Sequence, residues 1–271
     1  MKPMGPIPSE FAGQEELTIA GRSAASWAQA HGTPLFVYDG AIAAQRIARL
    51  RAALPDAVEI HFAIKANPYP PLLAALAPLV GGLDVASGGE MARALAVKPA
   101  HAISFAGPGK RDAELEAAIG AGVTLNLESE GEADRALAIA DRLGTPPRLA
   151  VRVNPDLELR GSGMRMGGRP SPFGIDAARV PALVRRLCDA GADWRGFHIF
   201  AGSQSLDTDA IVETQAETVK LAARLAQESG ARPPLVNLGG GFGIPYFHKD
   251  VPVDVERIGV ALGEALDARD P

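Results

Sequence analysis

The sequence predicts a parallel (β/α) barrel in which one of the eight strands needed for closure is absent. From Glu59 onward, apolar or β-branched runs alternate with alanine- and leucine-rich helical stretches, and about seven such units can be counted. This alternation is typical of a parallel sheet with right-handed crossovers. Polar residues follow the same end of these runs, as they do at the active face of a barrel. A doubly wound open sheet is the competing fold.

The predicted strands are short and nearly all apolar, which suits a sheet covered on its outer face. They span Glu59–Ala66, Leu83–Ser87, Ala102–Gly107, Val123–Ser129, Arg148–Pro155, Gly196–Ser203 and Leu235–Phe242. The predicted helices are one beginning at Pro71 and then Gly88–Ala96, Arg111–Ile119, Glu130–Leu143, Ala178–Ala190, Asp209–Ser229 and Val255–Ala268.

An earlier predicted strand, Thr33–Asp39, lies outside this series, and an amphipathic helix at Ala41–Leu54 follows it. We therefore expect an N-terminal arm and strand in residues 1–40 and a barrel domain in residues 41–271.

The composition is that of an ordinary globular protein. The chain has 271 residues, 47% of them hydrophobic and 22% charged, with a net charge of −5. This charge argues against nucleic-acid binding through a basic surface. Cys188 is the single cysteine, which favours a reducing compartment. Neither a targeting segment nor an apolar run long enough to span a bilayer is seen, so we expect a cytoplasmic protein without membrane contact.

Lys65 is the most informative single residue. Period-two alternation places His61, Ala63 and Lys65 on one face of their strand. If that face is the barrel interior, desolvation lowers the pKa of the amine and makes it a nucleophile suited to a Schiff base with an aldehyde. The alternative is a lysine at a strand end whose ammonium lies in solvent. Asp84, inside the next strand, needs a cationic or hydrogen-bonding partner, for which Lys65 is the candidate.

The glycine run Gly239–Gly241 is a second candidate site. Glycines let backbone N–H groups approach a phosphate closely, although a tight turn also explains the run. Ser203 is a second phosphate donor or, alternatively, a helix N-cap. The segment Leu157–Gly174 carries three arginines that would attract an anion if it lies at the barrel mouth; a solvated loop is the alternative.

Three further residues point into the predicted interior. His198 and Phe200 share one strand face, and either ring could stack on a flat ligand, although a histidine satisfied within the core is the alternative for His198. Arg152 points inward, with a salt bridge to a barrel carboxylate such as Glu128 as the structural explanation.

Several motifs occur in an order that resembles the fold-type III pyridoxal-phosphate decarboxylases, which include diaminopimelate, ornithine and arginine decarboxylases. They are FAIKANP, LDVASGGEM, NLESEGE, VRVNP, FGID, HIFAGSQ and NLGGGFG. The resemblance covers nearly the whole chain from Thr33. The longer segments SFAGPGKRD, RGSGMRMGG and GGGFGIPYF look like the subgroup associated with the exosortase A system of exopolysaccharide-producing bacteria.

The resemblance implies pyridoxal 5'-phosphate as cofactor, no metal, and decarboxylation of a small amino acid. Lys65 would form the Schiff base with the cofactor aldehyde and is the expected catalytic residue. The phosphate would be held by Ser203, Gly239, Gly240 and Gly241. Arg152 and Asp84 would lie near the ring, and His198 or Phe200 would stack on it. A homodimer is the expected assembly.

Two departures from the family pattern stand out. The histidine that stacks on the ring in better-known members is replaced by Phe200. The Glu-Pro-Gly-Arg motif of the last barrel strand and the β-rich domain after it are not found, since the chain ends at Pro271. We therefore expect a barrel truncated before its eighth strand and C-terminal β-domain, and a chain that is unstable or inactive alone. A non-catalytic cofactor-binding or regulatory homologue and a Schiff-base aldolase remain alternatives.

Overall fold

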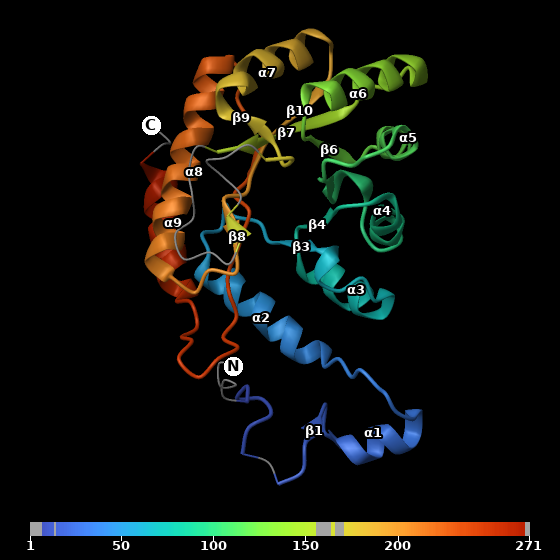
Figure 1. Ribbon diagram of the computed structural model, residues 1–271, viewed down its shortest axis with the longest axis vertical. Coiled ribbons are helices and arrows are strands. Elements are labelled where there is room, and N and C mark those ends of the chain that lie inside the picture. Colours follow the sequence, from blue (N-terminus) through green and yellow to red (C-terminus); the bar gives the residue numbers. More distant parts are fainter. Residues whose placement is uncertain (1–6, 14, 156–163, 166–170, 269–271) are drawn as a thin grey trace.

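A curled parallel sheet forms the centre of the fold (Figure 1). The computed structural model describes residues 7–13, 15–155, 164–165 and 171–268. Along the sheet the strand order is β12–β10–β7–β6–β5–β4–β3, with every neighbouring pair parallel. The strands are β3 (His61–Ala63), β4 (Gly82–Val85), β5 (Ile103–Phe105), β6 (Thr124–Leu127), β7 (Arg148–Asn154), β10 (Asp193–Ile199) and β12 (Leu235–Asn237). The predicted incomplete (β/α) barrel is confirmed.

Helices follow the curve of the sheet on its outer side (Figure 1). They are α3 (Pro70–Leu76), α4 (Gly88–Leu95), α5 (Asp112–Ala121), α6 (Glu130–Leu143), α7 (Val180–Asp189) and α8 (Thr208–Ser229). Three of them have a short polar side chain as N-cap, which accepts a hydrogen bond from a backbone N–H of the first turn. The caps are Ser87 for α4, Ser129 for α6 and Asp207 for α8. Single 3-10 turns span Ile64–Ala66, Ala77–Leu79, Ala100–Ala102 and Ala177–Arg179.

The main core lies between the strands and these outer helices. Phe105, Phe197, Leu125, Leu149 and Leu187 are among its fully buried side chains. Burying such large side chains contributes roughly 1.5–3 kcal/mol each, which makes this layer the main source of stability.

Two more helices complete this side: α9 (Val255–Asp267) packs on α8, and α2 (Gly40–Ala53) packs on α9. Arg49 of α2 binds Glu256 of α9 with two hydrogen bonds, of 2.8 and 2.9 Å. Arg257 pairs with Asp209 of α8. A second apolar cluster that includes Ile211 and Ile258 lies between α8 and α9. Among the described residues, no helix combines the length and the apolar character needed to cross a bilayer.

The N-terminal arm differs from the prediction. It holds a small hairpin, β1 (Thr18–Ile19) with β2 (Arg22–Ser23), and the helix α1 (Ala24–His31). The predicted strand Thr33–Asp39 is not formed: the segment pairs with no strand of the described chain. Leu35, Phe36 and Tyr38 are exposed, and Phe36 is 84% accessible. The segment has residues that favour a strand, but a strand also needs a neighbouring strand to pair with, and none lies beside it in the described chain.

The sheet is open between β3 and β12. Within the described residues, β3 pairs with β4 and β12 pairs with β10. Gly196 of β10 allows β12 to come close, since an added Cβ at its φ of +109° would overlap the Leu235 carbonyl oxygen.

Two short strands extend this scaffold. The strand β9 (Ile175–Asp176) adds to β7, and Asn154 donates to Asp176 over 3.0 Å. The strand β11 (Gly202–Ser203) pairs antiparallel with β8 (Met164–Arg165).

Candidate functional site

Lys65 lies just beyond β3, at the carboxyl edge of the sheet. The strand ends at Ala63, and a 3-10 turn at Ile64–Ala66 carries the lysine out of the strand alternation. Ile64 anchors this turn in the core, whereas Lys65 is exposed. Of the two placements that the sequence left open for Lys65, the structure matches the second, an exposed lysine at a strand end. Its amine is accessible to a ligand from outside.

Phe200 is the aromatic residue that faces this amine. It follows β10 and is half-buried, and the Lys65 Nζ atom lies 5.9 Å from the centre of its ring. The two residues come from strands at different places along the sheet, so the curl of the sheet is what brings them together (Figure 1).

His198 lies one layer deeper on β10, paired in register with Arg152 of β7 and Asn237 of β12. Its Nδ1 atom is inaccessible to solvent and has no hydrogen-bond partner in the described part of the chain. The alternative of a satisfied core histidine is therefore not supported. Desolvation and the nearby Arg152 charge lower the pKa of His198 to about 4, so the imidazole is neutral near pH 7.

Asp84 is engaged by residues other than Lys65. Its carboxylate is 3.1 Å from Nδ1 of His61, and it accepts a 3.1 Å bond from Asn237. Burial opposes ionisation of both groups, yet the hydrogen bond and charge between them raise the pKa of His61 and lower that of Asp84. The predicted Lys65–Asp84 pairing is wrong. Asp84 instead links β3 to β12, the two strands that flank the opening.

Arg152 confirms the predicted salt bridge: its Nη1 atom lies 2.9 Å from Oε1 of Glu128, and both side chains are buried. The guanidinium also lies 4.9 Å from the centre of the Phe173 ring. Glu128 accepts two backbone N–H bonds as well, from Gly107 over 2.5 Å and from Gly174 over 2.8 Å.

A second buried ion pair lies beside this one. Nζ of Lys110 is 2.6 Å from Oε1 of Glu132, with both side chains 1% exposed. Burial lowers the pKa of Lys110 and raises that of Glu132, although each partner's charge opposes the change. Sequence reasoning missed Glu132. The sequence feature that could have drawn attention to Glu132 is the Ser129-x-x-Glu132 spacing, which is typical of a helix start. In the structure, Ser129 does cap α6.

The glycine run packs against the loop after β10. Gly239 and Gly241 have φ values of +74° and +80°. A Cβ at Gly239 would lie 2.7 Å from the Phe200 ring, and one at Gly241 would overlap the Gly202 carbonyl oxygen, whereas Gly240 faces open space. The run thus needs glycine for its close approach, beyond what a simple turn requires.

Ser203 is half-buried in β11, next to this run. It does not cap the following helix, because Asp207 does so. Backbone bonds of Ser205 with Gly241 and Gly243, of 2.9 and 2.7 Å, join the two loops. Most of the segment Leu157–Gly174, including Arg160 and Arg169, lies outside the described residues.

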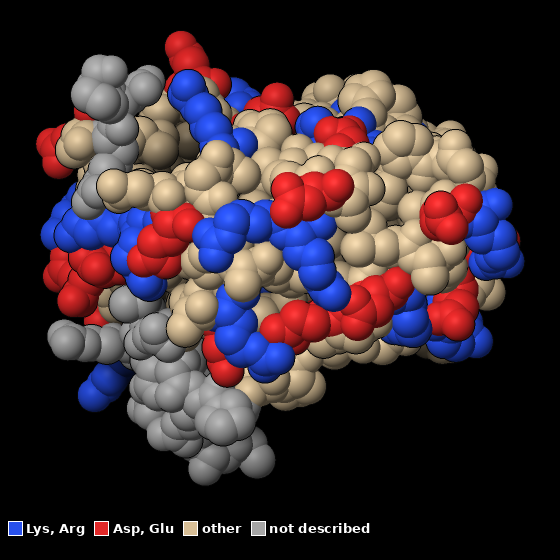
Figure 2. Space-filling view, turned by 90° about the horizontal axis from the view of Figure 1, so that it is seen from above, with Lys and Arg blue, Asp and Glu red and all other residues tan. Residues whose placement is uncertain are grey.

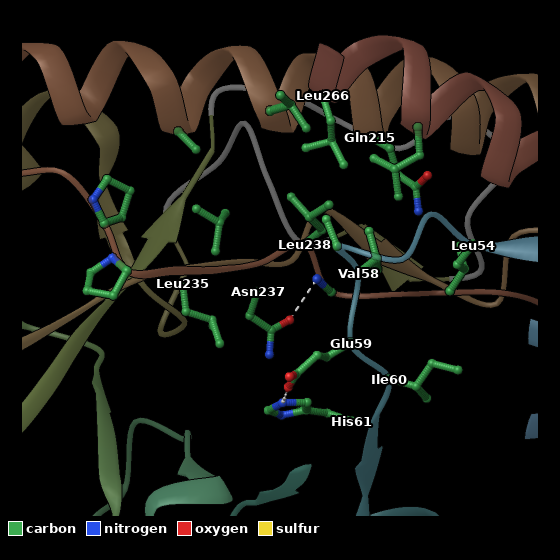
Figure 3. A pocket seen from close by; sticks show the side chains of 18 of the residues that line it. Leu54, Val58, Glu59, Ile60, His61, Gln215, Leu235, Asn237, Leu238 and Leu266 are labelled. Atoms are coloured by element: carbon green, nitrogen blue, oxygen red, sulfur yellow. Dashed lines mark hydrogen bonds and ion pairs between the residues drawn. The ribbon is translucent and has the colours of Figure 1, made fainter. Parts of the chain in front are cut away.

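A cavity of about 920 Å³ opens between β3 and β12 (Figure 3). Its walls are mostly apolar and come from both strands and from α2, α8 and α9, with Leu54, Leu235 and Leu266 among them. His61 and Asn237 lie on facing sides of this space in Figure 3. Lys65 and Ser203 do not line it, whereas Asp84 and Gly239 do, so this space borders the Lys65–Phe200 site.

Comparison with known proteins gives a consistent result. A family model described as "Pyridoxal-dependent decarboxylase, pyridoxal binding domain" matches residues 41–271. The L-glutamyl-[BtrI acyl-carrier protein] decarboxylase of Niallia circulans is 33% identical over 246 residues, covering 88% of this chain and 58% of that protein. Diaminopimelate decarboxylase of Aquifex aeolicus is 36% identical over 241 residues, covering 87% of this chain and 56% of that protein.

Solved structures agree. The crystal structure of diaminopimelate decarboxylase from Helicobacter pylori complexed with L-lysine matches with a TM-score of 0.83 and 27% identity, covering 91% of this chain and 63% of that one. The chain therefore spans less than two thirds of the length of each of these relatives.

Proposed function

This chain belongs to the pyridoxal-dependent decarboxylases through its pyridoxal-binding domain, and on that premise we propose that it serves the decarboxylation of a small amino acid, with Lys65 as its catalytic residue. The observation that carries the proposal is that the accessible Lys65 amine faces the Phe200 ring, and that this ring packs against Gly239 of the glycine run.

The residues present fit pyridoxal phosphate in three respects. The cofactor has an aldehyde, and Lys65 offers an exposed amine. It has a flat ring, and Phe200 offers an aromatic face near that amine. It has a phosphate, and Gly240 leaves open space at a loop whose neighbouring glycines already adopt positive φ. When bound, the cofactor supplies an aldehyde that combines with amines and a ring that draws away the electron pair left by departing carbon dioxide.

The chain's own residues would orient and hold the reactants. The backbone N–H groups of Gly239, Gly240 and Gly241, with the Ser203 hydroxyl, would bind the phosphate. Phe200 would pack against the ring, since its own ring lies 5.9 Å from the Lys65 amine. The groups on the cofactor side facing the barrel interior would be Arg152, His198 and Asp84, and these groups would determine the electrostatic potential at the cofactor ring.

Borohydride trapping tests the proposal. The purified chain is incubated with pyridoxal phosphate, reduced with borohydride and mapped by peptide mass spectrometry. We expect a pyridoxyl group on Lys65 that disappears in Lys65→Ala. Lys220→Ala, which removes an exposed lysine on α8, is the matched control and should leave labelling unchanged. Equal labelling of Lys65 and Lys220 in a folded chain would contradict the proposal. Labelling without carbon dioxide release from any amino acid would point to a non-catalytic cofactor-binding homologue.

We also propose the finer assignments that rest on the motifs alone. These are the exosortase A-associated subgroup with its exopolysaccharide context, a cytoplasmic location, a homodimeric assembly, and an arm in residues 1–40 before the domain in 41–271. The relatives act on substrates named as diaminopimelate and as a carrier-bound glutamyl group. Carbon dioxide release from free and carrier-bound amino acids would therefore be compared, and light scattering would test the dimer.

A further inference from the structure

Glu128 is a buried carboxylate whose two oxygens are both occupied, and it lies at the junction of three strand ends. We propose that Glu128 is the positioning residue of this site: it fixes Arg152 and the backbone at Gly107 and Gly174 in the arrangement that cofactor binding requires. The inference rests on the proposed function.

The contacts of Glu128 join elements that are far apart in the sequence. Oε1 accepts from the Gly107 N–H, just after β5, and from Nη1 of Arg152 on β7. Oε2 accepts from the Gly174 N–H, directly before β9. Phe173, the neighbour of Gly174, covers the Arg152 guanidinium. One carboxylate therefore sets both the position of Arg152 and the path of the chain that packs on it.

Glutamine cannot reproduce this pattern. Each side-chain oxygen of Glu128 faces at least one donor. In either orientation, the NH₂ group of a glutamine would therefore meet an N–H instead of an acceptor, leaving a buried donor unsatisfied.

Charge balance adds to this requirement. Glu128, Glu132, Lys110 and Arg152 are all less than 9% exposed, and together they carry two negative and two positive charges. Neutralising Glu128 would leave Arg152 as a buried cation without its ion-pair partner, which is strongly unfavourable.

Arg152 connects this network to the Lys65 site. It pairs in register with His198 on β10, and β10 leads within two residues to Phe200. Phe200 in turn faces the Lys65 amine. A shift of Arg152 would therefore displace β10 and, with it, the Phe200 ring beside the Lys65 amine.

The test compares Glu128→Gln with Glu114→Gln. Glu114 also accepts two backbone N–H bonds, from Gly88 over 2.7 Å and Arg111 over 3.0 Å, but it contacts none of the site residues and is a matched control. Pyridoxal phosphate binding is measured by absorption titration, and folding by urea denaturation. We expect Glu128→Gln to weaken binding about tenfold or more and Glu114→Gln to change it less than about twofold. Glu128→Asp, which keeps the charge, should recover part of the loss.

A double variant separates positioning from general stability. If Glu128 acts through Arg152, Glu128→Gln with Arg152→Gln should bind the cofactor no more weakly than Arg152→Gln alone. Should Glu128→Gln fail to fold, Arg152→Lys takes its place, because it keeps the cation but loses the planar fork, and it should show the same weakened binding. Cofactor binding by these variants at the wild-type level would overturn the inference. Failure of the wild type to label Lys65 would instead overturn the proposed function.

Discussion

The Lys65 amine lies 5.9 Å from the centre of the Phe200 ring, although β3 and β10 are separated in the sheet by β4, β5, β6 and β7. In a flat sheet at about 4.8 Å per strand, these two elements would be more than 20 Å apart. The closeness of the two side chains is therefore a direct product of the curl. On the face seen from above, Figure 2 shows acidic and basic side chains interspersed.

Replacing Phe200 with leucine should weaken pyridoxal phosphate binding by roughly two- to tenfold, because an aromatic pair contributes roughly 0.5–1.5 kcal/mol beyond its buried area. Absorption titration measures the change. Phe36→Leu, at an exposed position in the arm, is the control and should bind normally. A loss of binding in His198→Gln but not in Phe200→Leu would assign the stacking role to His198 instead.

His198 should make the chain less stable as the pH falls. Its folded pKa is lowered to about 4 from 6.5, so below about pH 6.5 the unfolded chain takes up a proton that the folded chain excludes. The resulting loss of stability should grow to at most about 3 kcal/mol near pH 4 and then level off. Urea denaturation between pH 4 and 7 checks this, and the free energy of His198→Gln should vary less with pH. Parallel curves for the two proteins would contradict the prediction.

Alanine at Gly241 should destabilise the fold by about 1–3 kcal/mol, because its φ of +80° is unfavourable for other residues and the new methyl group meets the Gly202 carbonyl. Gly240→Ala has open space around it and should cost less than about 1 kcal/mol. Denaturation midpoints compare the two. Equal effects at both positions would show that the loop adopts another conformation.

Lys110→Met should cost about 3–5 kcal/mol, since it leaves the buried Glu132 carboxylate without its partner. The double variant Lys110→Met/Glu132→Leu should recover most of that loss. The exposed pair Lys220–Glu217 serves as the comparison, and Lys220→Met should cost no more than about 1 kcal/mol. A double variant as unstable as Lys110→Met alone would contradict the ion-pair explanation.

Periodicity and turn residues were sufficient to predict most elements. The helix predicted at Glu130–Leu143 coincides with α6, and in the structure Ser129 caps its start while Gly144 ends it. The Arg152–Glu128 salt bridge, which the sequence offered as the structural explanation for an inward arginine, is present in the structure. The Thr33–Asp39 strand was wrong, because strand propensity does not supply a partner strand.

What the sequence did not predict correctly is which side chains lie next to one another. Strand alternation could not decide between a buried and an exposed Lys65, because the strand ends at Ala63 and the lysine lies in a 3-10 turn. Asp84 was expected to bind Lys65, but His61 on the adjacent strand lies directly within reach. The Lys110–Glu132 pair was missed, because the order of residues along the chain does not show which side chain of a helix points toward the end of a strand.

The sequence by itself determined the parallel strand–helix order and the family, since these depend on local periodicity and on ordered motifs. Only the tertiary structure decided that Phe200 faces Lys65, that Asp84 links β3 to β12, and that Glu128 ties three strand ends together. These relationships join residues brought close by the curl of the sheet and by side-chain packing, and neither spacing nor propensity along the chain contains that information.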